Sequence, residues 1–532
     1  MIGRVSAYYG RHDWAVDATL LLAITAAAGV LRLALLGDLP YGVHSDEAQV
    51  GTDAHRIISE GWIGLYTHAA LGQPAGHAYL TTPSIWLLGD TAFALRLPLA
   101  LVGVAAVPLL YLLVRVSYAR LEAVFASAML AVSYWHLFYS RVAHWSISYG
   151  TIVLAVLLCL SMGMRTRRRA WFVASGGLLG LGVYTYNIYP IAVAAVAVAI
   201  IAIGWLRYRG AEWAWWRGSV LVLGGAAVVV ALPMIVYLAN PHAYYWSHID
   251  NYSDVGVLRS TEFRNANAWE KLDLIVRQAG TFAKAYAVEG HLDNVDGNGL
   301  RPVFDIPTLV LLGSGGVVAF RRRGEPMIVM ALCCLAIIPL PAVLQRGSIM
   351  REPVGAAPFA MFIAALPLAA IWRGASGAGW RWRAAARVAA PIVLMAIAVL
   401  TVHDYFWSWR KDAWPRAIYF SEMTSASLYM RALPAGTQIY FYSERASINL
   451  ETRQFLAPDV SGQDRSYQFS TRGGSTDTSR ARPAVFVLLD AYLSLLPALQ
   501  QRYPDGHERL VARDGKTEFI AYEVPAVPLA AP

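Results

Sequence analysis

The chain has 532 residues, of which 57% are hydrophobic and only 15% are charged. Soluble globular proteins carry about a quarter charged residues, so the composition excludes an ordinary soluble domain. The net charge is +9, but arginines cluster in alternate short loops between apolar runs, as positive-inside bias places them. The charge therefore gives no reason to expect a nucleic-acid partner, and the pattern is typical of a multi-pass membrane protein.

We expect about eleven membrane-spanning helices, because about 20 apolar residues cross a bilayer as an α-helix. They are residues 15–36, 92–114, 121–137, 146–164, 170–186, 189–206, 220–238, 306–320, 327–344, 354–371 and 385–403. The loops between them alternate between arginine-rich and acid-richer sets, and positive-inside bias assigns the arginine-rich set to the cytoplasm. The N-terminus is then cytoplasmic, and the chain after the last span is extracytoplasmic.

The preference for arginine over lysine and the abundance of alanine indicate a GC-rich bacterial gene. The expected location is therefore the bacterial inner membrane, with the first span as a retained anchor. The three cysteines, Cys159, Cys333 and Cys334, all lie within predicted spans. We expect neither a disulfide framework nor a thiolate metal site in the extracytoplasmic regions.

The first extracytoplasmic loop covers about residues 37–91. Apolar residues recur with helical spacing over 46–60, and Ser45 is the expected N-cap. A second short helix is expected over 78–88, broken at Pro83. Neither is long enough to span the membrane, so both are expected to lie at the interface.

The tail is expected to form a small extracytoplasmic α/β domain, residues 406–532, after a transmembrane catalytic domain, residues 1–405. Strand-like runs alternate there with helical ones. The predicted strands are 437–442, 484–489, 509–512 and 518–523, and the predicted helices are 422–433 and 491–502. An amphipathic helix is also expected at 269–287, within the loop from 240 to 305.

Asp46 and Glu47 are the strongest catalytic candidates, because they form an acidic pair just after the first span. A carboxylate at a membrane surface can remove the proton of an attacking hydroxyl group within hydrogen-bond reach. The structural alternative is that both residues only start a solvated helix, where acidic side chains suit the helix dipole. The pattern alone favours neither.

Arg141 lies between two spans on the extracytoplasmic side, where positive-inside bias does not require an arginine. A guanidinium group suits bidentate binding of a phosphate. The alternative is a side chain that reaches the lipid headgroups. Arg96, Arg346 and Arg351 pose the same question.

Residues 293–299 superficially resemble a calcium-binding loop, but they lack the bidentate glutamate at the required distance. A loop that contacts substrate is the better interpretation. No cofactor is expected to be required, and a divalent metal is left as an alternative.

Four motifs occur in order: residues 44–48 (HSDEA), 94–98 (ALRLP), 133–141 (SYWHLFYSR) and 184–186 (YTY). With the layout of the spans, they resemble the GT-C membrane glycosyltransferases. The resemblance is closest to bacterial relatives of the protein O-mannosyltransferases and of the aminoarabinose transferase that modifies lipid A, a family 39-like group. It covers about residues 15–403 in layout and is sharpest over 37–189.

The resemblance implies a polyprenyl-phosphate sugar as donor, inversion at the anomeric carbon, and Asp46 as general base with Glu47 beside it. It also implies that Arg141 holds the donor phosphate. His44, Tyr139, His144 and Tyr186 are the expected substrate-contacting residues. The acceptor is expected to be a lipid, a glycan or a protein.

One departure concerns the first loop, where many relatives have a basic residue just before a proline. This chain has Gly72-Gln73-Pro74 instead. Either Arg346 or Arg351 compensates for the missing charge, or the affinity for the donor is altered.

Two other functions are alternatives to the enzyme. A transporter or flippase of lipid-linked glycans requires charged residues that line a path through the spans, and the predicted spans have few. A receptor would need only the tail, which would then bind a cell-wall glycan.

Overall fold

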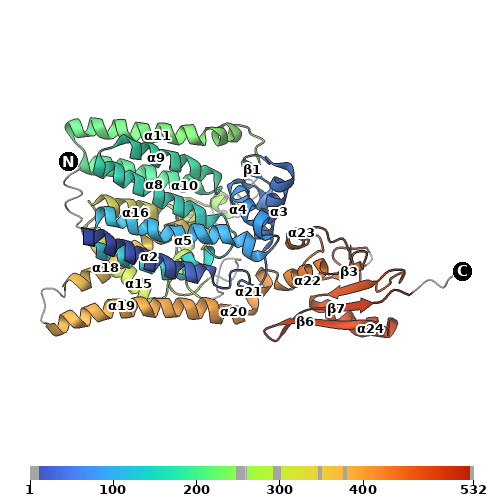
Figure 1. Cartoon of the computed structure of the whole chain (residues 1–532). Helices are drawn as coiled ribbons and strands as arrows, with labels where there is room; N and C mark the ends of the chain where they lie inside the picture. The colour runs from blue at the N-terminus through green and yellow to red at the C-terminus, as the bar shows by residue number, and fades with distance from the viewer. Residues whose placement is uncertain are drawn as a thin grey trace. The chain divides into compact units, whose positions relative to one another are not determined.

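The computed structural model describes residues 11–246, 258, 260–290, 301–344, 350–374, 380–471 and 473–527. They form two compact units, each described by itself (Figure 1). The membrane unit takes the described residues of Met1–Ala34, Trp62–Leu80 and Arg96–Trp407. The mixed unit takes those of Leu35–Gly61, Thr81–Leu95 and Ser408–Pro532.

The membrane unit is almost entirely helical. Its helices, of which α5 begins in the mixed unit, are α2 (Arg11–Leu33), α5 (Ala92–Ser117), α6 (Arg120–Val132), α7 (Tyr134–Tyr139), α8 (Ser146–Thr166), α9 (Arg169–Leu181), α10 (Tyr189–Arg207), α11 (Gly210–Leu238), α13 (Thr261–Asn265), α14 (Ala268–Ala287), α15 (Ile306–Arg321), α16 (Pro326–Ile337), α17 (Leu340–Leu344), α18 (Ala357–Gly374) and α19 (Trp380–His403). Single-turn elements η1 (Ala69–Leu71), η2 (Gly182–Tyr184) and η4 (Glu352–Ala356) join them. A short hairpin pairs β1 (Tyr66–Thr67) with β2 (Gln73–Pro74).

Among the described residues, eight helices are long and apolar enough to cross a membrane. They are Trp14–Leu33, Ala92–Ser117, Ser146–Thr166, Tyr189–Arg207, Gly210–Leu238, Pro326–Leu344, Glu352–Gly374 and Ala384–Lys411. The predicted count of about eleven is not confirmed, because α6, α9 and α15 are only 13, 13 and 16 residues long. The predicted span 121–137 is interrupted because Ser133 leaves the helical conformation and caps α7.

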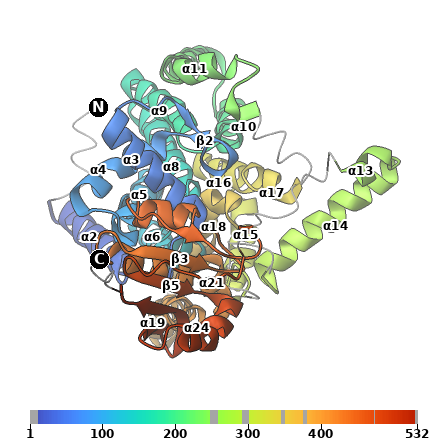
Figure 2. The same ribbon diagram turned by 90° about the vertical axis from the view of Figure 1, so that its right-hand side faces the viewer.

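Packing in the membrane unit brings together helices that are neighbours in the sequence as well as distant ones. Helix α9 packs against α8 and α11, and α18 packs against α6 and α15. Figure 1 shows α8, α9, α10 and α11 running alongside one another. Figure 2 shows α13 and α14 extending away from the other helices. The amphipathic helix predicted at 269–287 is confirmed as α14.

The mixed unit combines a five-stranded sheet with short helices. Its elements are α3 (Ser45–Glu60), most of α4 (Gly76–Leu88), α20 (Trp409–Lys411), α21 (Ala413–Ile418), α22 (Ser421–Arg431), β3 (Gln438–Tyr442), α23 (Glu451–Leu456), β4 (Gln463–Asp464), β5 (Ala484–Leu488), η7 (Asp490–Leu495), α24 (Leu496–Arg502), β6 (His507–Arg513) and β7 (Lys516–Val524). A π-turn, η6 (Asp404–Ser408), precedes α20. All four predicted strands and the predicted helix 422–433 are present, the predicted helix 491–502 is divided into the 3-10 element η7 and α24, and β4 is an additional short strand.

The sheet has the strand order β4-β3-β5-β7-β6. β3 is parallel to β4 and β5, whereas β7 is antiparallel to β5 and β6. Alternate residues of β3 face two separate apolar cores. Ile439 and Phe441 pack with Met423 and Met430 of α22, and Tyr440 packs on the opposite face with residues of η7 and α24.

The first-loop helices differ from the prediction in two details. His44, not Ser45, is the N-cap of α3, because the ring nitrogen Nδ1 of His44 accepts the N–H of Asp46 at 3.1 Å. Helix α4 is not broken at Pro83 but continues through it. The helices themselves are confirmed, and α3 packs against α23 of the tail within the mixed unit.

Candidate functional site

The start of α3 holds the acidic pair in a capping box. His44 accepts the Asp46 N–H, and the Glu47 carboxylate accepts the His44 N–H at 3.2 Å. Such a box satisfies two main-chain donors that a helix start otherwise leaves without partners. Because Nδ1 of His44 acts as an acceptor, the ring carries its proton on Nε2 when it is neutral.

The capping box distinguishes the two carboxylates that the sequence could not separate. Glu47 is 3% exposed and takes part in the cap. The side chain of Asp46 is 24% exposed and lies 3.7 Å from Nδ1 of His44. Glu47 thus has a structural role at the helix start, and Asp46 keeps a carboxylate that solvent can reach.

The segment before α3 contacts the tail inside the mixed unit. The His44 ring lies 6.1 Å from the ring centre of Tyr419 and 6.2 Å from that of Phe420. Gly42 lies so close to the tail that a Cβ atom there would come within 2.0 Å of the Tyr419 carbonyl oxygen. A glycine is therefore required at this contact.

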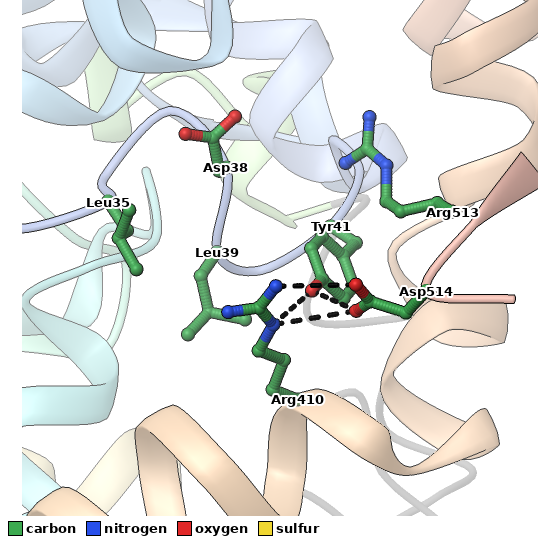
Figure 3. Close-up of a pocket in the computed structure, with 7 residues that line it drawn as sticks. All are labelled: Leu35, Asp38, Leu39, Tyr41, Arg410, Arg513 and Asp514. Atoms are coloured by element: carbon green, nitrogen blue, oxygen red, sulfur yellow. Dashed lines mark hydrogen bonds and ion pairs between the residues drawn. The ribbon is translucent and has the colours of Figure 1, made fainter.

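A cavity of about 230 Å³ lies beside this segment, within the mixed unit. Figure 3 shows its lining residues: Leu35, Asp38, Leu39, Tyr41, Arg410, Arg513 and Asp514. The Tyr41 hydroxyl donates to the Asp514 carboxylate, and Arg410 donates to both of them. Burial raises the pKa of Tyr41, and the hydrogen bond from Tyr41 lowers the pKa of Asp514. Tyr41 therefore remains protonated and Asp514 ionised.

Glu422 is a second perturbed carboxyl group in the mixed unit. It accepts a hydrogen bond from Nη1 of Arg445 at 2.6 Å. Burial nevertheless raises the pKa of Glu422 to about 7, and the neighbouring carboxylates of Asp490 and Glu518 act in the same direction.

Arg141 belongs to the membrane unit and is completely buried. Its Nη1 donates to the carbonyl oxygens of Leu31 and Arg32, each at 2.9 Å, at the C-terminal end of α2. Its guanidinium carbon lies 5.1 Å from the ring centre of Tyr405 and 5.0 Å from that of Phe406. These contacts place Arg141 at a helix end, where a cation complements the helix dipole. Its role in phosphate binding stays a prediction.

Arg32 is a buried cation that the sequence reasoning missed. It donates to the carbonyl oxygens of Leu130 and Ala131 at the end of α6 and to Nδ1 of His136. Arg32 has no carboxylate partner among the residues that the structure describes. The available signal was an arginine within a predicted span, which is rare enough to indicate a function.

Three predicted substrate-contacting residues come together in the membrane unit. The His144 ring lies 6.3 Å from that of Tyr139 and 5.8 Å from that of Tyr186. All three side chains are buried. His77 lies near this cluster. The centres of the His77 and Trp145 rings are 6.4 Å apart, and Nε2 of His77 is hydrogen-bonded to the Ser148 hydroxyl at 2.7 Å. Burial lowers the pKa of His77 to about 3, so it is neutral at physiological pH.

The remaining predicted arginines are placed in part. Arg96 is completely buried in α5, and Arg351 is half-buried just before η4. Arg346 and the stretch 293–299 lie outside the described residues. Asp46, Glu47 and His44 belong to the mixed unit, whereas Arg96, Arg141 and Arg351 belong to the membrane unit. The predicted meeting of Asp46 with these arginines therefore stays a prediction.

Comparisons with known proteins identify the fold. Residues 72–239 match the family model described as dolichyl-phosphate-mannose-protein mannosyltransferase. ArnT from Cupriavidus metallidurans bound to undecaprenyl phosphate is similar with a TM-score of 0.56 at 15% identity, over 98% of this chain and 99% of that one. The chain has the GT-C fold. The fold expected from the four motifs is therefore confirmed, and the chain is a multi-pass membrane protein.

Another GT-C structure extends the likeness. The oligosaccharyltransferase of Archaeoglobus fulgidus tethered to an acceptor peptide gives a TM-score of 0.53 at 14% identity, over 83% of this chain and 63% of that one. No curated protein sequence matches the chain. The matched family segment begins after Asp46, so the assignment of the base depends on the geometry of α3 and on the motif.

Proposed function

We propose that this protein transfers a sugar from a polyprenyl-phosphate carrier to an acceptor hydroxyl group at the extracytoplasmic face of the bacterial inner membrane. The main support is the likeness to ArnT with undecaprenyl phosphate bound, which extends over nearly the whole of both chains. The match of residues 72–239 to a mannosyltransferase family model supports the same reaction class. In this proposal the N-terminus is cytoplasmic and the mixed unit is extracytoplasmic.

Asp46 acts as the general base in this reaction. It takes the proton of the acceptor hydroxyl group while the acceptor oxygen forms a bond to the anomeric carbon. The bond from that carbon to the phosphate oxygen breaks, and its electron pair leaves with the polyprenyl phosphate. Attack from the face opposite the leaving group inverts the anomeric carbon. A phosphate monoester leaves readily when cations stabilise its developing charge, so the scheme uses no covalent intermediate.

Asp46 is assigned as the base, and Glu47 is not, because their surroundings differ. Glu47 is 3% exposed and its carboxylate closes the capping box. Asp46 is partly exposed, and the helix start fixes its main chain. A base must reach the substrate proton, which favours the more accessible carboxylate on a rigid support.

The donor phosphate is assigned to arginines of the membrane unit. Arg141 is the first candidate, with Arg96, Arg351 and Arg346 as further ones. The support is electrostatic: Arg141 is buried, and its acceptors include the main-chain carbonyl of Arg32, a second buried arginine. Two cations in a low-dielectric region raise the local positive potential, which attracts an anionic headgroup.

The test of this function is transfer by the purified full-length protein in lipid nanodiscs. Synthetic undecaprenyl-phosphate hexoses and pentoses serve as donors, with envelope lipid and glycan extracts as acceptors. Asp46→Asn is expected to lower kcat by about 10²- to 10⁴-fold, the usual contribution of a general base. Glu47→Gln retains the cap acceptor and is expected to lose less than about tenfold.

Glu60→Gln is the matched control, since Glu60 is an exposed carboxylate at the other end of α3. It is expected to behave as wild type. Full activity of Asp46→Asn would reject the base. Movement of the donor lipid across the bilayer without any glycosyl transfer would favour the flippase instead.

A further inference from the structure

Val43, the residue just before the N-cap of α3, is held by two threonines of the tail. Its N–H donates to Oγ1 of Thr424 at 3.0 Å, and Oγ1 of Thr452 donates to its carbonyl oxygen at 3.0 Å. Val43 is completely buried. A buried main-chain group without a partner is costly, so these two hydroxyl groups determine where this segment lies.

Two glycines allow the same segment to approach the tail closely. A Cβ atom at Gly42 would lie 2.0 Å from the Tyr419 carbonyl oxygen, and one at Gly51 would lie 2.3 Å from the Phe455 ring. Gly42 also has a φ of +156°, which side-chain-bearing residues rarely adopt. The tail therefore contacts α3 and the residues before it at Gly42, Val43 and Gly51.

The contacts at Val43 lie only three residues from Asp46. His44 forms the cap, and the Asp46 N–H donates to the His44 ring. The chain between Val43 and Asp46 is therefore in a fixed conformation, and a displacement of Val43 moves the carboxylate. A displacement of about 1 Å at a reacting group can cost about 100-fold in rate.

We propose that Thr424 and Thr452 are positioning residues that set the place of the Asp46 carboxylate, so that the tail takes part in catalysis. This inference rests on the proposed function, in which Asp46 is the base. It assigns the tail a role that differs from that of a separate glycan-binding module. The two threonines act through Val43 and contact no substrate.

The test uses the full-length protein and substitutions that keep the side-chain shape. Thr424→Val and Thr452→Val remove the hydroxyl groups. Each is expected to lower kcat about 10-fold and the pair about 100-fold, with the donor KM changed less than about twofold. Thr424→Ser keeps the hydroxyl group and is expected to restore most of kcat. Thr437→Val is the matched control, because within the described part of the chain the Thr437 hydroxyl donates only to the nearby Pro434 carbonyl.

A double-mutant cycle of kcat with Asp46→Asn distinguishes a loss of activity through a displaced Asp46 from a loss of activity through unfolding of the protein. If Thr424 acts through Asp46, Thr424→Val has no further effect once the carboxylate is gone. Multiplicative effects in the cycle would overturn the inference. Wild-type kcat in Thr424→Val/Thr452→Val, together with an inactive Asp46→Asn, would also overturn it while leaving the proposed function intact.

Full transfer by Asp46→Asn would instead reject Asp46 as the base, and a wild-type protein that transfers no sugar would reject the proposed function. Should the double valine variant fail to fold, each single variant is taken through the same cycle. Hydrogen exchange of the Val43 amide gives an independent measurement. It is expected to be faster in Thr424→Val than in Thr424→Ser, and equal exchange in the two would contradict the inference.

Discussion

Two buried arginines of the membrane unit and one of the mixed unit are held in different ways. In the membrane unit, Arg32 and Arg141 donate to main-chain carbonyls at the ends of α6 and α2. In the mixed unit, Arg416 donates to the carboxylates of Glu518 and Asp514, at 3.1 and 3.0 Å. Helix-end carbonyls carry only a partial negative charge. They stabilise a guanidinium group without cancelling its charge, whereas a carboxylate neutralises it.

This difference separates charges that can serve a substrate from charges that hold the fold. Among the residues that the structure describes, Arg32 has no carboxylate partner, so a positive potential remains around it, as the proposed anionic lipid donor requires. Around Arg416 the positive and negative charges balance. The hydroxyl groups of Ser421 and Ser425 also donate hydrogen bonds to the Glu518 carboxylate. The comparison leads to two opposite expectations for the removal of one arginine from each unit.

The largest effect is expected for Arg32→Met in the membrane unit. The substitution removes the hydrogen bonds from the guanidinium group to the carbonyls of Leu130 and Ala131 and to the ring nitrogen of His136. At about 1.5–3 kcal/mol for each lost hydrogen bond to a charged group, the free energy of unfolding should fall by about 4 kcal/mol. Because the carbonyls belong to the main chain, no second side-chain substitution is expected to restore the loss.

Denaturant unfolding of the purified protein in mixed micelles measures this change. Arg323→Met is the control, since Arg323 is an exposed residue of the same unit. The control is expected to change the free energy by less than about 0.5 kcal/mol. A loss below about 1 kcal/mol for Arg32→Met would show that these carbonyls find other donors.

In the mixed unit, Arg416→Met is expected to cost about 3 kcal/mol, because it leaves Glu518 buried without its cation. Here a second substitution should help. Arg416→Met/Glu518→Met removes both charges, and replacing a buried ion pair by apolar residues is often neutral. The double variant is expected to recover at least half of the loss in the same unfolding measurement.

Arg482→Met provides the baseline for the mixed unit, because Arg482 is exposed. A double variant that is less stable than Arg416→Met alone would contradict the expectation. It would mean that the ion pair stabilises the unit through its other contacts, such as the hydrogen bond from Arg416 to the Arg513 carbonyl.

The elements of the fold were largely predictable, because they depend on local patterns. Apolar period and length located the helices, and strand-like runs between helical ones located β3, β5, β6 and β7 in the tail. The number of spans was less predictable. Local features of the chain shorten individual helices, as Ser133 does when it separates α6 from α7.

The candidate site was predictable only as a set of residues. Asp46 and Glu47 were found as a pair, but their different roles depend on a helix cap formed by His44. Such caps are usually formed by short polar residues, so the sequence did not indicate this one. Tyr41 and Asp514 are 473 residues apart in the sequence, and no local pattern indicates that they meet. The same holds for Val43 with Thr424 and Thr452. Contacts of this kind depend on how distant segments pack.

The smallest effect is expected for Glu422. It tests whether an arginine partner in the mixed unit is enough to keep a buried carboxylate ionised. Glu422 is paired with Arg445, but burial and two nearby carboxylates raise its pKa from 4.5 to about 7. A raised pKa means that the folded protein binds a proton more tightly than the unfolded chain does. The stability from Glu422 is therefore complete below pH about 4.5 and is lost as the pH rises through about 7.

The difference between these pKa values corresponds to at most about 3 kcal/mol, and neighbouring groups will reduce what is observed. Wild type should lose more stability between about pH 5 and about pH 8 than Glu422→Gln, since glutamine keeps an acceptor for Arg445 and does not ionise. Hydrogen exchange of α22 in the full-length protein at the two pH values, corrected for the intrinsic exchange rate, measures the difference. An identical pH dependence of stability in both proteins would contradict this expectation and would mean that Arg445 fully neutralises Glu422. A single arginine partner would then be enough to keep a buried carboxylate of the mixed unit ionised.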